Sequence, residues 1–148
     1  MTEKLDLDHL RGWIGRTTEA SDIVTARQAG RELAAELGFS SSELTVIATA
    51  ISEIARNILA YAIQGEISLA LVHDDRNPQR GAPQRGIMIV AHDEGPGIRD
   101  IPEAMQDGFT TGKGLGIGLP GTRRLMDEFE IVTRIGQGTT VKMKKWLR

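Results

Sequence analysis

Two glycine clusters separated by a polar segment constrain this chain more than any other feature. The first, Asp93 to Gly97, has the sequence Asp-Glu-Gly-Pro-Gly and directly follows the apolar run Ile87 to Ala91. The second, Gly112 to Gly118, lies just ahead of Pro120. A short apolar run is typical of a buried strand, so we expect Asp93 at a strand end, which is where sheets hold ligands.

Glycine in these clusters suits a flat ligand that carries phosphates. Without a Cβ atom, Gly95 and Gly97 let the main chain approach a flat ring closely. The second cluster has three glycines whose N–H groups can turn toward phosphate oxygens: Gly114, Gly116 and Gly118. Pro120 fits the first turn of a helix, whose N-terminus offers free N–H donors and partial positive charge. The pattern indicates a nucleotide site.

Two commoner glycine motifs nearly match this region, and both are excluded. Gly116 to Gly121 fits G-x-G-x-x-G, yet no strand precedes it and no acidic residue follows Glu130 to hold a ribose. Gly108 to Gly114 resembles a P-loop, but only three residues separate Gly108 from Gly112, where a P-loop has four. Gly114 also follows the lysine where Ser or Thr would bind magnesium.

Length, charge and cysteine content narrow the class of protein. With 148 residues, the chain forms one domain with a substantial core, without room for a sensor and a dimerisation module as well. A net charge of −2 and a pI near 5.9 provide no basic footprint for nucleic acid. The chain has no cysteine, no signal peptide in Met1 to Arg16 and no run of membrane-spanning length. We expect a soluble cytoplasmic component that binds neither nucleic acid nor membrane.

The N-terminal part is expected to contain an arm, an edge strand and two helices. Residues 1–11 are expected to be an arm, and Gly12 to Thr18 are expected to form an edge strand, so that residues 1–16 are an arm or edge extension ahead of the domain. Asp22 is the expected N-cap of a first helix that ends at Gly38, a C′ residue. Ser40-Ser41-Ser42-Glu43 has the form of a capping box, and the helix it starts is predicted to run to about Ile63.

The second helix has an apolar face and, opposite it, a polar row. Its apolar residues recur at helical spacing: Leu44, Ile47, Ala48, Ile51, Ile54, Ala55, Ile58 and Ala62. At about 100° per residue, Thr49, Glu53 and Asn57 lie along the opposite face. A Glu and an Asn at this spacing most often belong to a solvated face. Here the helix precedes the strand that ends at Asp93, and a carboxylate beside an amide oxygen can supply a base and a magnesium ligand.

The remaining segments predict four strands and one more helix. The expected strands are Glu66 to Val72, Gly86 to His92, Phe129 to Ile135 and Thr139 to Leu147, with a helix from Pro120 to about Glu128. The polar segment Asp74 to Arg85 is expected to be a long exposed loop, and Ile98 to Lys113 a lid over the nucleotide. Short connections favour antiparallel pairing with the helices on one face, which is an α+β two-layer sandwich.

Four elements in this order resemble the GHKL ATPase/kinase superfamily, which has the Bergerat nucleotide-binding fold. They are the N-box Glu53 to Asn57, the glycine boxes Asp93 to Gly97 and Gly112 to Gly118, and the trailing Gly136 to Thr140. Further runs are similar to the RsbT-type serine/threonine switch kinases of the bacterial stressosome, including Asp22 to Gln28, Thr49 to Ile58 and Lys145 to Arg148. The resemblance covers roughly residues 17–148, which implies a GHKL ATP-binding kinase domain with a mixed, mostly antiparallel sheet.

The resemblance implies a role for each residue of these motifs. Asp93 would accept a hydrogen bond from the adenine amino group of ATP, with Gly97 and Thr139 supporting the base. Asn57 would coordinate Mg²⁺, and Glu53 would orient or deprotonate the attacking hydroxyl. Further nucleotide contacts are expected from Gly95, Lys113, Gly114, Leu115, Gly116, Ile117 and Gly118. For Lys113 the argument is its charge, which can neutralise phosphate, although an exposed lysine in a lid is as often solvated.

The resemblance also implies an activity and partners. The protein would transfer the γ-phosphate of ATP to a serine or threonine of STAS-domain antagonist and scaffold proteins of a stressosome. Once released, it would bind and activate a downstream PP2C-type phosphatase or a similar effector. A nucleotide-gated anti-sigma-type binding regulator is the alternative, and a plain ATPase is the third possibility. Histidine phosphorylation is disfavoured because the chain has no room for a phosphoacceptor domain, and His92 is more often a structural residue at such a position.

Overall fold

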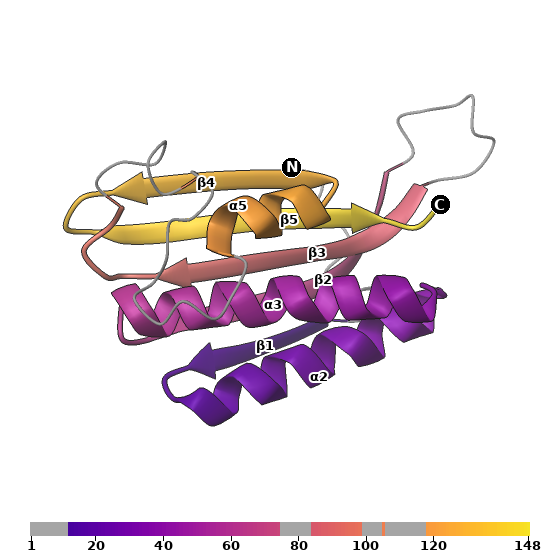
Figure 1. Ribbon diagram of the computed structural model, residues 1–148, viewed down its shortest axis with the longest axis horizontal. Helices are drawn as coiled ribbons and strands as arrows, with labels where there is room; N and C mark the ends of the chain where they lie inside the picture. Colours follow the sequence, from indigo (N-terminus) through magenta and orange to yellow (C-terminus); the bar gives the residue numbers. More distant parts are fainter. Residues whose placement is uncertain (1–11, 75–83, 99–104, 106–117) are drawn as a thin grey trace.

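The computed structural model describes residues 12–74, 84–98, 105 and 118–148, which form one sheet with helices on one face (Figure 1). The elements in chain order are β1 (Gly12–Thr17), α2 (Ala20–Leu37), α3 (Ser41–Tyr61), β2 (Gly65–Asp74), β3 (Gln84–Asp93), α5 (Gly118–Leu125), β4 (Glu128–Arg134) and β5 (Gly138–Trp146). The predicted α+β two-layer sandwich is confirmed.

The sheet has the strand order β1-β2-β3-β5-β4, and each of its four pairings is antiparallel. The expected edge strand near the N-terminus is β1, which pairs with β2. Because β3 lies in the middle, its last residue, Asp93, is flanked by Gly65 of β2 and Thr139 of β5. Residues from three distant parts of the chain therefore meet at one end of the sheet.

The first helix begins differently from the sequence prediction. Its N-cap is Glu19, and Asp22 is the third helical residue rather than the N-cap. The Oδ2 atom of Asp22 accepts hydrogen bonds from the backbone N–H groups of Thr18 at 2.9 Å and Glu19 at 3.1 Å. These bonds, first that of Thr18, lower the pKa of Asp22. The predicted end is confirmed, because Gly38 has a left-handed φ of 108°.

The second helix is the core helix of the fold. The predicted capping box is present, since Ser40 Oγ accepts from the backbone N–H of Glu43 at 3.2 Å and the Ser40 N–H donates to Glu43 Oε1 at 3.0 Å. Ile47, Ile51 and Ile54 are almost completely buried. The helix is long and apolar enough to match a membrane span, but here its apolar face packs into the core. It ends at Tyr61, because Ile63 has a φ of 72° that no helix contains.

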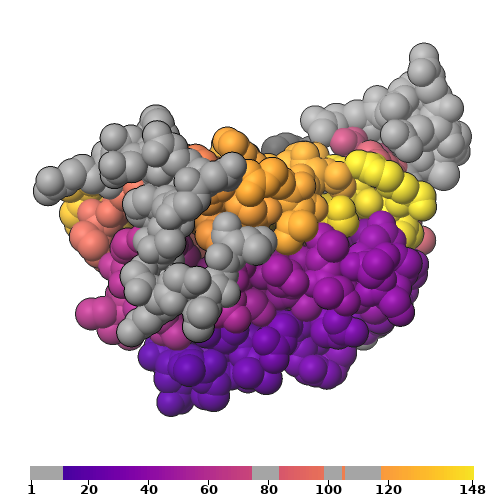
Figure 2. All heavy atoms as spheres, viewed as in Figure 1, coloured from indigo at the N-terminus to yellow at the C-terminus, as the bar shows by residue number. Residues whose placement is uncertain are grey.

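The C-terminal elements lie close to the predicted positions. Helix α5 starts two residues before Pro120 and ends at Leu125, and it lies beside α3 on the same face of the sheet (Figure 2). Strands β4 and β5 are joined at Gly136, whose φ is 80°. Most of the predicted loop between β2 and β3, and nearly all of the predicted lid, lie outside the residues that the structure describes.

Candidate functional site

Asp93 lies where the sequence places it, at the end of β3 and on the helix-covered side of the sheet. Its carboxylate oxygen Oδ1 accepts a hydrogen bond from the backbone N–H of Gly95 at 2.9 Å. Within the described part of the chain, no residue donates a hydrogen bond to Oδ2. The side chain is therefore fixed through one oxygen, and the other oxygen remains an acceptor for a ligand amino group.

The first glycine box is packed between the end of α3 and the hairpin that joins β4 and β5. A Cβ atom added to Gly95 would lie 2.6 Å from the Cβ of Ala62. One added to Gly97 would lie 2.6 Å from the carbonyl oxygen of Arg134, and Gly97 also has a φ of 84°. Both glycines are therefore required by close backbone packing, in addition to any approach of a ligand.

Two threonines hold the first glycine box onto the sheet. Thr139, a predicted site residue, is buried, and its Oγ1 lies 2.9 Å from Oγ1 of Thr133. Thr133 Oγ1 accepts a hydrogen bond from the backbone N–H of Ile98 at 2.8 Å. Thr133 belongs to none of the sequence motifs. Its role follows from the register between β4 and β5, which places Thr133 directly opposite Thr139.

Within the N-box, Glu53 projects from α3 toward the start of α5. Glu53 is nearly buried, with 9% of its side chain exposed, and it forms an ion pair with Arg56 through Oε2. Its other oxygen, Oε1, accepts from the backbone N–H of Gly118 at 3.2 Å. Asn57 follows one turn later and is partly buried, and no described residue shares a hydrogen bond with its side chain.

This donor set fits Mg²⁺ held jointly by the protein and by substrate phosphates. The described residues contain no group of three or more His, Cys, Asp or Glu that would hold a metal ion alone. Magnesium is usually bound by one or two protein oxygens together with phosphates and water, and the amide oxygen of Asn57 is a donor of that kind. A dedicated metal cage is therefore not needed for this chemistry.

Only part of the second glycine box can be placed. Gly118 is the first residue of α5, and its φ of 69° lies in the left-handed region. Thr122 donates a hydrogen bond through Oγ1 to the carbonyl oxygen of Gly118 at 2.8 Å, which fixes the first turn. The predicted contacts from Lys113, Gly114, Leu115, Gly116 and Ile117 fall outside the described residues.

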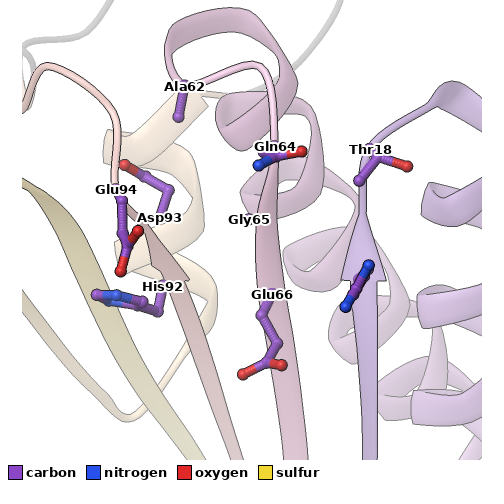
Figure 3. A pocket seen from close by; sticks show the side chains of 9 residues that line it. Thr18, Ala62, Gln64, Gly65, Glu66, His92, Asp93 and Glu94 are labelled. Carbon is purple, nitrogen blue, oxygen red and sulfur yellow. The ribbon is translucent and has the colours of Figure 1, made fainter.

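A hollow of about 640 Å³ adjoins Asp93 at the ends of β1, β2 and β3 (Figure 3). It is lined by Arg16, Thr18, Ala62, Gln64, Gly65, Glu66, His92, Asp93 and Glu94. Among the predicted site residues that the structure describes, Asp93 lines this hollow, whereas Glu53 and Asn57 of the N-box do not. His92 Nδ1 lies 2.8 Å from Thr140 Oγ1, in agreement with the structural role expected for it.

Comparison with known proteins identifies the family. The chain matches the family described as Histidine kinase-like ATPase domain over residues 17–145. It is 52% identical over 127 residues to Serine/threonine-protein kinase RsbT of Bacillus subtilis (strain 168), which covers 86% of this chain and 90% of that protein. It is 33% identical over 129 residues to an Anti-sigma F factor of Caldanaerobacter subterraneus subsp. tengcongensis, covering 82% and 83%.

A solved structure shows the same fold. The crystal structure of the RsbU and RsbW domains of Rv1364c from Mycobacterium tuberculosis matches with a TM-score of 0.61 at 19% identity. The match covers 93% of this chain and 33% of that longer chain, so it supports the domain fold alone. The family match, the identity to RsbT and the structural match all agree with the arrangement of the N-box and the first glycine box. The chain belongs to the histidine kinase-like ATPase domain family, and within that family it is of the RsbT type.

Proposed function

We propose that this protein is an ATP-dependent protein serine/threonine kinase that acts as a partner switch. The observation that carries the proposal is the contact between Glu53 of the N-box and the backbone N–H of Gly118 in the second glycine box. It brings a nearly buried carboxylate to the start of a helix where phosphates are commonly bound. The similarity to Serine/threonine-protein kinase RsbT supports the same activity.

The adenine end of the site is formed by the end of β3. The Oδ2 atom of Asp93, to which no residue of the described chain donates, accepts the adenine amino group, while the backbone N–H of Gly95 keeps the carboxylate in place. Gly97 lets the backbone come close to the adenine ring, and Thr139, which pairs with Asp93 across β5 and β3, lies beneath the ring. The nucleotide then extends from Asp93 along α3 toward Glu53.

The phosphate end carries the chemistry. The oxygen of the acceptor hydroxyl forms a bond to the γ-phosphorus of ATP, the bond from that phosphorus to the β,γ-bridging oxygen breaks, and ADP leaves with the bonding electrons. The hydroxyl proton passes to the carboxylate of Glu53. Asn57 would contribute an oxygen ligand to Mg²⁺, and the ion would neutralise phosphate charge. Such reactions depend mainly on alignment and charge stabilisation, which explains how one carboxylate and one amide suffice.

The segment before α5 completes the phosphate site in this proposal. Backbone N–H groups of Gly114, Leu115, Gly116, Ile117 and Gly118 contact phosphate oxygens, and Lys113 adds a positive charge. This part of the proposal rests on the sequence, apart from Gly118. The position of Gly118 at the start of α5 supports it, because the segment must lead directly from the polar loop into that helix.

The names of the relatives support a partner switch, and the identity of the partners is part of the proposal. Since one is named an RsbT kinase and another an anti-sigma F factor, we infer a switch in which the protein alternates between binding partners in the cytoplasm. Its acceptors are STAS-domain antagonist and scaffold proteins of a stressosome. Phosphorylation weakens that complex, because a dianion in an interface repels acidic groups and is costly to desolvate. The released kinase activates a PP2C-type phosphatase or a similar effector.

A nucleotide-gated binding regulator with little kinase activity is the second candidate, favoured by the similarity to an anti-sigma F factor. Glu53→Gln separates the two, since it removes the base but keeps an acceptor for the Gly118 N–H. A kinase loses phosphate transfer to a STAS-domain protein about 100-fold or more while its affinity for that protein is retained. Unchanged transfer in Glu53→Gln contradicts the role of Glu53. Absence of any transfer in the unmodified protein, with ATP bound, favours the binding regulator.

A further inference from the structure

We propose that Arg56 is the positioning residue for the carboxylate of Glu53. The inference rests on the proposed function, in which Glu53 orients or deprotonates the acceptor hydroxyl. Arg56 lies three residues after Glu53 on α3, and its Nη1 atom forms an ion pair with Glu53 Oε2. Residues at this spacing face each other on a helix surface. The sequence motifs point to Glu53 and Asn57 and leave Arg56 between them without a role.

The two oxygens of the carboxylate have different partners. Arg56 takes Oε2 from the same helix, and the backbone N–H of Gly118 takes Oε1 from α5 at 3.2 Å. A glutamate on a helix normally samples several rotamers, and holding it in one costs conformational entropy. Contacts on both oxygens restrict this side chain to one orientation across the gap between α3 and α5. Arg56 is one of the two groups that impose it.

The ion pair between Glu53 and Arg56 joins a nearly buried side chain to an exposed one. The side chain of Glu53 is 9% exposed and that of Arg56 is 46% exposed. A nearly buried carboxylate is costly without a positive partner or hydrogen bonds. Arg56 provides the charge while nearly half of its own side chain stays exposed to solvent, so the cost of burying a second ion is reduced. Its removal leaves Glu53 with only the Gly118 N–H among the contacts that the structure describes.

The Gly118 N–H is a donor that a phosphate oxygen would also use. A carboxylate and a phosphate cannot both occupy one N–H donor, so phosphate binding at the start of α5 releases Oε1 of Glu53. The Oε2 atom then remains held by Arg56. In this arrangement Oε1 becomes free to accept a proton from the hydroxyl at the moment when the phosphates are in place. Arg56 keeps the carboxylate pointing at that position.

The test combines a structural readout without ATP and steady-state kinetics. In Arg56→Ala, the amide proton of Gly118 shifts in the NMR spectrum of the nucleotide-free protein, because Oε1 is no longer fixed. With ATP and a STAS-domain acceptor, kcat falls about 10- to 100-fold, the range expected for a misplaced catalytic group, while KM for ATP stays the same. Arg56→Lys retains part of the rate, and low concentrations of guanidinium ion restore part of it to Arg56→Ala.

Matched controls separate the possible failures. Arg31→Ala removes an arginine from α2 that has no ion pair in the described structure, and it leaves both readouts unchanged. An increased KM for ATP in Arg56→Ala, with kcat unchanged, would mean that Arg56 contacts the nucleotide and would overturn the inference. An unchanged Gly118 amide and unchanged kcat overturn it as well. If Glu53→Gln retains full kcat, the proposed role of Glu53 fails, and if the unmodified protein binds ATP without transferring phosphate, the proposed kinase activity fails, whatever Arg56 does.

Discussion

The carbonyl oxygen of Asp93 lies directly against Gly138, so that a Cβ atom added to Gly138 would stand 2.0 Å from it. Gly138 also has a φ of 129°, a backbone conformation that residues other than glycine rarely adopt. Asp93 ends β3 and Gly138 begins β5, so this contact fixes how Asp93 sits against the trailing Gly-x-Gly-Thr element. Position 138 therefore requires glycine for two independent reasons, the positive φ and the close contact with the Asp93 carbonyl oxygen.

Gly138→Ala is expected to destabilise the protein by more than about 2 kcal/mol and to weaken nucleotide binding, because the backbone of Asp93 must move. Gly136→Ala in the same hairpin is the matched control. Its φ is 80°, but no atom lies within 4 Å of the added Cβ, so only the backbone strain of about 1 kcal/mol applies. Urea denaturation measures both variants. Equal losses of stability would contradict the contact with Asp93.

Thr133 is expected to support the first glycine box although it is absent from the sequence motifs. Thr133→Val removes the acceptor of the Ile98 N–H and the partner of the Thr139 hydroxyl, and it should cost about 1–3 kcal/mol. Nucleotide affinity should fall with it, because Ile98 directly follows Gly97. Thr45→Val, whose exposed hydroxyl bonds only to the Ser41 carbonyl, should cost less than about 0.5 kcal/mol. Calorimetric titration with ATP checks the affinity.

The capping box of α3 predicts a pH dependence of stability. The backbone N–H of Ser40 and then its hydroxyl lower the pKa of Glu43 below its ordinary value of 4.5. A carboxyl whose folded-state pKa is lowered contributes stability above its unfolded-state pKa and loses the contribution as pH falls through the folded-state pKa. Glu43→Gln should therefore cost less than about 1 kcal/mol at neutral pH, since the group is exposed. The difference from the unmodified protein should be constant above pH 4.5, shrink as the pH falls below 4.5, and vanish only once the pH is below the lowered folded-state pKa of Glu43.

The C-terminal end of β5 is expected to depend on Asp127. Its Oδ2 atom accepts from the backbone N–H of Trp146 at 2.7 Å, and its Oδ1 accepts from Arg148 Nη2 at 2.7 Å. Asp127→Ala should cost about 1–3 kcal/mol, because a partly buried N–H loses its acceptor. Glu130→Ala is the control, since its contact with Lys142 at 3.7 Å is exposed and contributes little. Equal midpoints of thermal unfolding for the two variants would contradict this assignment.

Much of the fold follows from local sequence patterns. The apolar spacing of α3 predicts the face on which Ile47, Ile51 and Ile54 are buried, and its capping box predicts where it starts. The apolar run before Asp93 predicts a strand with the aspartate at its end, which β3 confirms. These features depend on neighbours within a few residues, and the period of the pattern identifies the element.

Features that depend on distant residues could not be predicted in this way. The contact of Glu53 with Gly118 joins residues 65 positions apart, and nothing in either local pattern implies it. The role of Thr133 depends on its register with β5. Two local predictions were also wrong in detail. Asp22 is not the N-cap of α2, because Glu19 has the extended conformation of an N-cap residue. Helix α3 stops before Ile63, which has a left-handed φ, and isoleucine rarely adopts that conformation, so the sequence does not predict the turn.

The most direct test of the account is transfer of label from γ-labelled ATP to a purified STAS-domain partner in the presence of magnesium. Asn57→Ala and Asp93→Ala are assayed beside the unmodified protein, with Gly136→Ala as a folded control. The account predicts label on a serine or threonine of the partner with the unmodified protein and the control, and none with the two site variants. Label that persists in both site variants, or none from an unmodified protein that binds ATP, would contradict it.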